Sequence, residues 1–273
     1  MIRKLATIAL FAMVAAMLIS SGCGGHGSKN KNKEEAKPVY VSKGDEGTIS
    51  GTVSFDGVPP AAKSIDMSGD AQCMSAASDK KSDEVLVTSG KLANVLVYLK
   101  GGPADKFSFP VSSDAVVLDQ KGCRYHPRTL GIQVNQKFEV TNSDPTTHNV
   151  HPSPRLNKEW NQSQTAGQAP IVNSFTKKEL MVPVKCNQHN WMRANVGVLD
   201  HPFFAVSVEN GSYTIKGVPP GTYTVVFWHE TLGEQTQQVT VAAKESKTQD
   251  ITYKSGTAYA PGSMQIGPAL VLP

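Results

Sequence analysis

The sequence shows little helical periodicity and no strong excess of charge of either sign. The first observation limits the possible fold classes, and the second limits the possible partners. Gly (23) and Pro (17) are frequent among the 273 residues, and short alternating segments lie between them. That pattern predicts an all-β protein. The formal net charge is +4, and removal of Arg3 and Lys4 with a leader would lower it by two. A nearly neutral chain gives no reason to expect nucleic acid or an anionic membrane face as a partner.

Long apolar runs are also scarce, and the one near the start is too short for a membrane span. It extends from Leu5 to Ile19 and follows the basic pair Arg3 and Lys4. A spanning helix needs about 20 apolar residues. The combination is typical of a bacterial export signal, which we place at residues 1–22.

Cysteine is rare, with 4 in the chain, and Cys23 follows the export signal directly. The small residues 20–22 before it resemble the lipobox of bacterial lipoproteins, which implies a diacylglycerol anchor on Cys23. Ser20 stands where that family usually has Leu, so the alternative is an ordinary signal peptide and a soluble periplasmic protein. Either interpretation places the chain on the periplasmic side of the cell envelope, where disulfides form. By the same resemblance, Gly24 favours the outer membrane.

Residues 23–46 are rich in Gly, Ser, Lys, Asn and Glu, which is typical of a linker. Residues 255–273 are expected to be a tail without regular structure. The polar stretch 63–82 is expected to be irregular, and the polar stretch 152–173 is expected to be a long loop or an edge excursion. Alternating apolar residues predict strands at 48–55, 85–87, 95–99, 116–118, 130–134, 138–140, 180–186, 196–198, 205–208, 213–215, 222–228 and 237–241.

One short loop, Cys186-Asn-Gln-His189-Asn-Trp-Met192, contains a thiol, an imidazole and a thioether. These donors suit a copper ion that alternates between Cu(I) and Cu(II). A second imidazole is offered by His148 in Thr-Thr-His-Asn-Val-His. Two His and one Cys in a plane, with a weak axial Met, form a type 1 (blue) copper site for electron transfer. The sequence therefore predicts His148, Cys186, His189 and Met192 as copper ligands.

The position of Cys186 in its strand agrees with this hypothesis. Leu180, Val182 and Val184 alternate, and Cys186 has the same parity, so we expect all four side chains on the inward face. Zinc is a weaker alternative, because Met is a poor zinc ligand. A nucleophilic Cys186–His189 pair is an enzymatic alternative, but it has no oxyanion motif and leaves the Met unexplained.

The other histidines are expected to be ordinary surface or hydrogen-bonded residues rather than ligands. They include His126, His151 and His201. The run Trp228-His229-Glu230 could form a second metal or partner site. The simpler interpretation is a packed Trp with a solvated His and Glu.

Cys73 and Cys123 remain once Cys23 is assigned to lipid and Cys186 to metal. In an oxidising compartment we expect them to pair, and the competing interpretation is two free buried thiols. A bond over so long a loop would stabilise the fold by about 3–5 kcal/mol in the chain-entropy model.

The stretch from residue 112 to 201 resembles a cupredoxin of the amicyanin or plastocyanin type. The resemblance is carried by Thr-His148-Asn149-Val-His and by the Cys-x2-His-x2-Met spacing, which is closest to amicyanin. It implies one mononuclear copper held by the four predicted ligands. It also implies that Asn149 ties the first-ligand segment to the Cys loop. Asn190 replaces a usual Pro and Trp191 a usual Phe, which leaves every ligand in place.

The flanking segments resemble a carboxypeptidase regulatory-like domain, a transthyretin-like β-sandwich. The first motif is Ile49-x-Gly-x-Val53-x3-Gly, and the second is the run 210–225 with Gly-Val-Pro-Pro-Gly-Thr-Tyr. We expect one sandwich at residues 47–111 and 202–254 with the cupredoxin inserted at 112–201. The alternative is two consecutive domains. A Cys73–Cys123 bond would join host to insert.

Together these features predict a copper protein that transfers single electrons in the cell envelope and is not itself an enzyme. The resemblance implies a redox partner protein that docks near His189, whose edge would be exposed at the surface. The alternative is a cell-envelope binding or structural module in which copper is stored, structural or absent.

Overall fold

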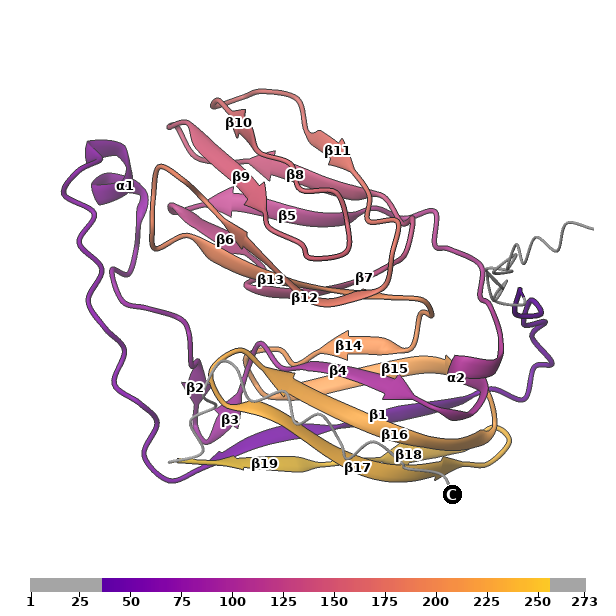
Figure 1. Cartoon of the computed structure of the whole chain (residues 1–273). Helices are drawn as coiled ribbons and strands as arrows, with labels where there is room; N and C mark the ends of the chain where they lie inside the picture. The colour runs from indigo at the N-terminus through magenta and orange to yellow at the C-terminus, as the bar shows by residue number, and fades with distance from the viewer. Residues whose placement is uncertain (1–35, 256–273) are drawn as a thin grey trace, which may run out of the picture. The chain divides into compact units, whose positions relative to one another are not determined.

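The computed structural model describes residues 36–255, which form sheets joined by turns (Figure 1). Their strands make up four sheets, so the predicted all-β class with β-sandwiches is confirmed. Within residues 36–255, no helix is both long enough and apolar enough to cross a membrane. The predicted export signal, Cys23 and the tail from residue 256 lie outside the described residues.

Strands from the two ends of the described chain pair with one another, and we call their two sheets the flanking sandwich. In one sheet the order is β15-β1-β3-β2, and β18 and β19 also pair with β1. In the other the order is β14-β4-β16-β17. The bounds are β1 Gly47–Asp56, β2 Val87–Thr88, β3 Lys91–Leu92, β4 Leu96–Lys100, β14 Phe204–Val206, β15 Ser212–Val218, β16 Gly221–His229, β17 Gly233–Val241, β18 Ser246–Thr248 and β19 Ile251–Lys254.

The strands between them form two further sheets, which we call the central sandwich. Their orders are β10-β9-β12-β13-β7 and β11-β8-β5-β6. Strand β7 runs parallel to β13, and β5 runs parallel to β8. The bounds are β5 Val116–Lys121, β6 Arg124–His126, β7 Thr129–Gln133, β8 Phe138–Asn142, β9 His148–Pro152, β10 Gln162–Gln164, β11 Ile171–Asn173, β12 Glu179–Lys185 and β13 Arg193–Leu199.

Each sandwich has its own apolar core, because alternate residues of its strands point inward. In β15, Tyr213 and Ile215 are buried while Thr214 between them is exposed. The flanking core also contains Val97 and Phe227. The central core is built in the same way from Leu118, Ile132, Phe138, Val140, Val182, Val196 and Val198.

A third apolar cluster links the two sandwiches. It contains Leu96, Tyr98, Leu199 and Val226, with Met181, Phe204 and Val206 packed against it. Two glycines permit this close approach. A Cβ atom on Gly131 would lie 2.3 Å from a ring carbon of Phe204, and one on Gly197 would lie 2.4 Å from a methyl of Leu96. A larger residue at either position would force the facing side chain to shift.

The stretch 63–82 was expected to be irregular, but it contains a short helix, α1 (Ala71–Ala76), whose N-cap is Asp70. A second short helix, α2 (Gly102–Lys106), follows β4 and has Pro in its first turn. Within 152–173, the strands β10 and β11 lie at sheet edges and pair with β9 and β8, which agrees with an edge excursion.

Leu180 was expected on the inward face of β12 but is 42% exposed. The pairing of β12 with β13 shifts register between Glu179 and Val182, and Met181 has a φ of 60°. Because of this irregularity, the inward and outward positions are exchanged in the part of β12 before Val182. After it, Val182, Val184 and Cys186 are all buried, as predicted for the end of the strand that leads to the Cys loop.

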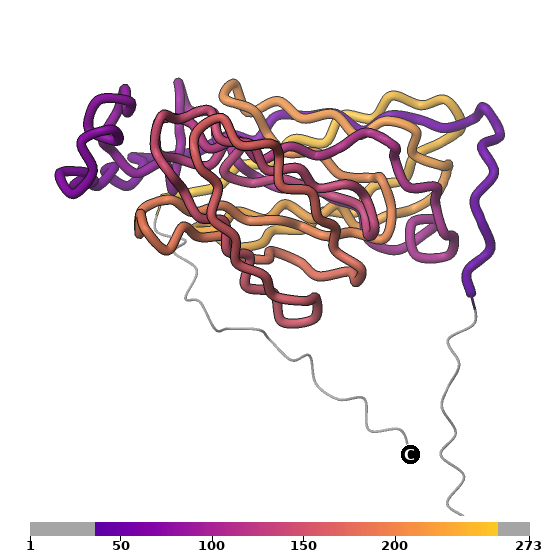
Figure 2. Tube along the Cα trace, turned by 90° about the horizontal axis from the view of Figure 1, so that it is seen from above, coloured from indigo at the N-terminus to yellow at the C-terminus, as the bar shows by residue number. Residues whose placement is uncertain are grey.

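Between β1 and β2 the chain leaves the flanking sandwich, and we call residues 57–86 the capping segment. In the Cα trace of Figure 2 it is the purple excursion that returns to the sheet. Its helix α1 contacts the loop between β12 and β13 through Asp70 and Cys73, as described below. The capping segment therefore lies over one end of the central sandwich.

Candidate metal centre

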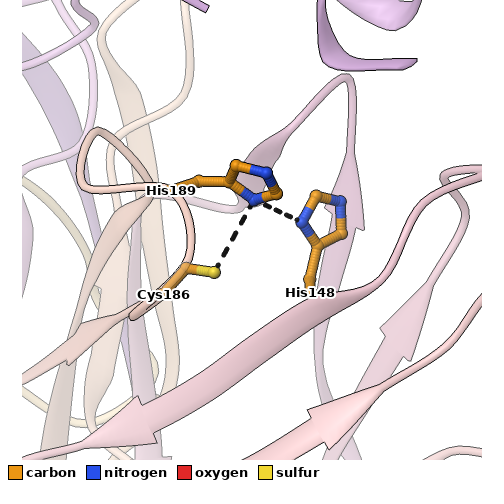
Figure 3. A group of neighbouring side chains, drawn as sticks. All are labelled: His148, Cys186 and His189. Atoms are coloured by element: carbon orange, nitrogen blue, oxygen red, sulfur yellow. Dashed lines mark hydrogen bonds between the residues drawn. The ribbon is translucent and has the colours of Figure 1, made fainter. Parts of the chain in front are cut away.

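Three of the predicted ligands converge at this end of the central sandwich (Figure 3). His148 begins β9, Cys186 directly follows β12, and His189 lies in the loop to β13. The antiparallel pairing of β12 with β9 sets Lys185 opposite His151, which brings the start of β9 toward the Cys loop. The fold thus unites residues that are up to 41 positions apart in sequence.

The donor atoms of this cluster lie close together and away from solvent. The Nδ1 atoms of His148 and His189 are 3.0 Å apart, and the Cys186 Sγ is 3.7 Å from the His189 Nδ1. His148 is 0% exposed, Cys186 is 3% exposed and His189 is 5% exposed. The structure therefore contains a buried His2Cys cluster able to hold a metal ion.

The protonation of the two imidazoles explains why the cluster suits a cation. Each Nε2 faces a carboxylate, 2.8 Å away for His148 and 3.1 Å for His189. An ionised carboxylate can only accept, so each Nε2 carries its proton and each Nδ1 presents a lone pair. Two lone pairs that face each other beside a thiol are stable only with a proton or a cation between them.

The separations also fit a shared ion. With bonds of about 2.0 Å to nitrogen and about 2.3 Å to sulfur, an ion in a trigonal plane separates N and S by roughly 3.7 Å and two nitrogens by roughly 3.5 Å. The distance between the Cys186 Sγ and the His189 Nδ1 is 3.7 Å, and the two Nδ1 atoms are closer together, at 3.0 Å. The donor set and its nitrogen–sulfur spacing therefore agree with a mononuclear site.

Backbone and side-chain hydrogen bonds hold Cys186 in position. The Asn149 N–H donates to its Sγ at 3.4 Å, and the Asn187 N–H donates to the Asn149 Oδ1 at 3.1 Å. Asn149 thus connects the His148 segment to the Cys loop. Burial raises the pKa of the Cys186 thiol, but bonds from His148 and from loop N–H groups outweigh it and lower the pKa. The thiolate, which is the metal-binding form, is favoured.

His148 is supported by a carboxylate that the sequence reasoning missed. Asp144 accepts its Nε2–H and also the backbone N–H groups of Gly122 (2.6 Å) and Cys123 (2.7 Å). Burial alone lowers the pKa of His148, but its bonds to Asp144 and Cys186 raise it above its usual value. Asp144 stands four residues before His148, and this spacing is the signal that the sequence offers for the contact.

His189 is covered, so the expectation of an exposed His189 edge is wrong. Its Nε2 is 3.1 Å from the Asp70 Oδ2 and 3.7 Å from the Cys73 Sγ, both in the capping segment. Burial lowers the pKa of His189, and the bond to Asp70 offsets this only in part. Nothing in the sequence near residue 70 indicates this contact.

Cys73 and Cys123 form a disulfide with their Cα atoms 5.5 Å apart. The bond joins α1 of the capping segment to the turn between β5 and β6 of the central sandwich. Cys186 is the free, buried cysteine of the described chain. Cys23 lies outside the described residues.

Met192 is buried, with 1% exposure, in the same apolar cluster as Cys186. Its backbone N–H donates to the His189 carbonyl, and its carbonyl accepts from the Cys186 N–H at 3.2 Å. Trp191 beside it is half-buried and donates its Nε1–H to the Cys123 carbonyl at 3.0 Å. The ring centroids of Trp191 and His189 are 5.1 Å apart.

The remaining histidines of residues 36–255 lie outside this cluster. His151 contacts Asn187 and Glu159, and His126 is exposed. The interpretation of His229 as solvated is wrong, since its exposure is 1%. Its Nδ1 accepts backbone N–H bonds from the turn that follows β16, which draws the ring inward.

The family model of the carboxypeptidase regulatory-like domain matches residues 192–254. This range contains the later strands of the flanking sandwich, β14 to β19. It starts before the predicted boundary at residue 202 and includes β13, which pairs within the central sandwich. No protein with curated annotation matches the chain.

Several solved structures share part of the fold. A proline-to-glycine mutant of amicyanin is 22% identical over 32% of this chain and 85% of its own, with a TM-score of 0.29. A purple cupredoxin from Nitrosopumilus maritimus is 22% identical over 31% and 99%, with a TM-score of 0.27. A copper-containing nitrite reductase from Thermus scotoductus is 18% identical over 37% of this chain but only 27% of its own, with a TM-score of 0.30.

Both families predicted from the sequence are found in these comparisons. The model of one matches residues 192–254, and about a third of the chain is similar to solved structures of the other.

Proposed function

We propose that this chain is a mononuclear type 1 copper protein that transfers single electrons and is not itself an enzyme. The supporting observation is the convergence of two imidazole Nδ1 atoms and the Cys186 Sγ in one buried cluster. His148, Cys186 and His189 would hold the ion, with Met192 as the predicted weak fourth ligand. A copper ion so bound accepts and releases one electron.

The protein holds these nitrogen and sulfur donor atoms in fixed positions. Cys186 is fixed by the end of β12 and by the Asn149 N–H. Each imidazole is fixed by a carboxylate on its far nitrogen, which also holds the tautomer that presents Nδ1. Fixed donors support electron transfer because little needs to rearrange when the charge of the site changes.

The proposal includes a location and a domain arrangement. Export and a lipid on Cys23 would place the protein on the periplasmic side of the bacterial cell envelope. The pairing of β1 and β4 with strands after residue 204 supports a cupredoxin inserted into a carboxypeptidase regulatory-like host. The linker at residues 23–46 would separate both from the membrane.

The redox partner protein would dock near His189, at the loop that carries Trp191. His189 itself is 5% exposed, whereas Trp191 is half-buried and lines a surface pocket with Ile65 and Arg193. Its ring is the nearest aromatic bridge from His189 to that pocket. We therefore place the electron exit at Trp191 rather than at the imidazole edge.

Burial of His189 also favours a second candidate, a cell-envelope module that binds or retains copper without passing electrons. A closed site holds its metal well and is hard for a partner to reach. The two candidates differ in redox behaviour, because a carrier shows a reversible one-electron couple and a storage module does not.

The test is a visible and EPR spectrum of the full chain, extracted in detergent and loaded with copper, beside Cys186→Ala and His151→Ala. An intense thiolate-to-copper band with narrow copper hyperfine splitting is expected in the parent and in His151→Ala, and its loss in Cys186→Ala. His151 is the matched control because it lies on β9 outside the cluster. A colourless parent, or a tetragonal spectrum unchanged in Cys186→Ala, would overturn the proposal.

A further inference from the structure

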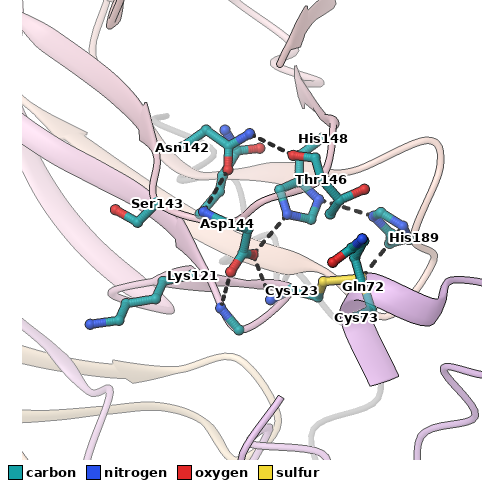
Figure 4. A network of polar contacts seen from close by, with 12 residues as sticks. Gln72, Cys73, Lys121, Cys123, Asn142, Ser143, Asp144, Thr146, His148 and His189 are labelled. Atoms are coloured by element: carbon teal, nitrogen blue, oxygen red, sulfur yellow. Dashed lines mark hydrogen bonds and ion pairs between the residues drawn. A yellow bond between two sulfur atoms is a disulfide. The ribbon is translucent and has the colours of Figure 1, made fainter. Parts of the chain in front are cut away.

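The two imidazoles of the cluster share an arrangement that the proposed function does not by itself require. Each donates its Nε2–H to a carboxylate. His148 donates to Asp144, as Figure 4 shows, and His189 donates to Asp70. The two acids come from different elements, the turn before β9 and the N-cap of α1. Two negative charges thus face the cluster from the side opposite to the donor atoms.

Both carboxylates are fixed by several hydrogen bonds. Asp144 is 5% exposed and accepts two backbone N–H groups besides the imidazole. Asp70 accepts the N–H groups of Gln72 (2.8 Å) and Cys73 (3.0 Å), and its Oδ2 accepts the Thr146 hydroxyl at 3.2 Å. Groups that only accept from donors in this way are ionised, and such bonds keep them so.

The disulfide connects these two supports. The Cys73 N–H donates to Asp70, and the Cys123 N–H donates to Asp144. The Cys73–Cys123 bond therefore joins the two backbone segments that hold the two carboxylates. Together with the two imidazoles, which contact each other and these two carboxylates, these residues form a closed ring of contacts.

We infer that Asp70 and Asp144 act as positioning residues that stabilise Cu(II) at the copper site and so lower its reduction potential. The Cys73–Cys123 disulfide links the backbone segments that hold these two carboxylates. The inference rests on the proposed function. Its physical basis is that a fixed negative charge one imidazole away stabilises the more positive metal ion, and a carboxylate partner makes the imidazole a stronger donor. Both effects favour Cu(II) over Cu(I).

Burial strengthens the bias, because charges inside the protein are screened less than charges at its surface. Asp144, at 5% exposure, lies inside the protein, and Asp70 is half-buried.

The experiment measures the midpoint potential of the copper-loaded full chain in detergent for Asp70→Asn, Asp144→Asn and the control Asp250→Asn. Asp250 accepts a backbone N–H from Thr52 in the flanking sandwich, so its substitution makes the same change of net charge far from the cluster. We expect each of the first two variants to shift the Cu(II)/Cu(I) affinity ratio toward Cu(I) by about tenfold or more. A tenfold change corresponds to about 59 mV upward for a one-electron couple.

A second readout covers the case in which Asp144→Asn does not fold, since Asp144 is the more buried acid. In the Cu(I) form of the parent, proton NMR should show slowly exchanging Nε2–H resonances for His148 and His189. Asp70→Asn, at the half-buried acid, should lose the His189 resonance and raise the potential while leaving the blue spectrum in place.

The outcomes separate this inference from the proposed function. A parent without a type 1 spectrum contradicts the proposed function and takes the inference with it. A blue parent whose potential responds to Asp70→Asn and Asp144→Asn no more than to Asp250→Asn overturns the inference alone. A downward shift in either variant does the same.

Discussion

The Nε2 atom of His189 lies 3.1 Å from a carboxylate oxygen of Asp70, which is 119 positions earlier in the chain. This contact closes the capping segment over the imidazole that would otherwise face solvent. It distinguishes the site from one whose outer histidine serves as the contact for a redox partner. The first two predictions follow from this closure.

The disulfide should stabilise the closed arrangement. The double variant Cys73→Ser/Cys123→Ser opens a loop with a sequence separation of 50, so the free energy of unfolding should fall by about 4 kcal/mol in the chain-entropy model. The capping segment should also detach more often, so small soluble oxidants should react faster with the reduced copper form. Denaturant unfolding and stopped-flow absorbance measure the two effects.

Met74→Ser is the matched control for the disulfide variant, since Met74 is 42% exposed on the same helix. It should change neither quantity appreciably. Equal reactivity of the double variant and the parent would show that the capping segment does not limit access to His189.

Trp191 should carry electrons between His189 and the surface. Trp191→Phe keeps a ring beside His189, whereas Trp191→Leu removes it, and both lose the hydrogen bond to the Cys123 carbonyl at a cost of about 1 kcal/mol in stability. We expect slower electron self-exchange in Trp191→Leu than in Trp191→Phe, measured by NMR line broadening. Trp228→Leu in the flanking sandwich is the control. Equal rates in the two Trp191 variants would contradict the assignment.

The cluster itself could be predicted because its signals are local. The spacing in residues 186–192 specifies donors in one loop, and strand parity buries Cys186 with Val182 and Val184. The same alternation wrongly predicted that Leu180 is buried. The irregularity at Met181 arises from the pairing of β12 with β13, and no sequence pattern indicates it.

The carboxylates could not be predicted in the same way. Asp70 reaches His189 only through the path of the capping segment, and the surrounding residues are polar without periodicity. The burial of His229 could not be predicted for a related reason. It ends a strand next to a Glu, which suggests solvent, but tertiary packing turns its ring inward and leaves Glu230 to pair with Arg128.

Two buried histidines should make the fold sensitive to acid. Burial lowers the pKa of His201 and of His229 to about 4, and each Nε2 is buried without a partner among the described residues. Above pH 6.5 both states of the chain hold these rings neutral. As the pH falls from about 6.5 to 4, only the unfolded state gains the protons, so stability decreases by up to about 3 kcal/mol per histidine. Below pH 4 this loss stays constant.

Denaturant unfolding between pH 4 and 7 measures how the free energy of unfolding depends on pH. The double variant His201→Asn/His229→Asn should show a flatter pH dependence, and His126→Asn, at an exposed histidine, should show the parental one. A double variant that retains the parental slope would assign the acid sensitivity to other groups.

Arg128 should be the most sensitive charge of the described chain outside the cluster. It is 6% exposed, and its guanidinium pairs with Asp83 of the capping segment and with Glu230 of the flanking sandwich. Burial alone lowers the pKa of Arg128, but these acids raise it, so it remains charged. Arg128→Met would leave Glu230 without its cation and Asp83 paired with Arg124 alone, and should cost about 3–5 kcal/mol of unfolding free energy.

The companion variants test whether that cost comes from unpaired charge rather than lost packing. Arg128→Met/Glu230→Gln removes the carboxylate that has lost its cation and should recover part of the stability. Arg193→Met changes an exposed arginine on β13 and should stay near the parent. If the double variant is no more stable than Arg128→Met, the three-way pairing contributes by packing, and the capping segment depends on the disulfide and on Asp70 for its position.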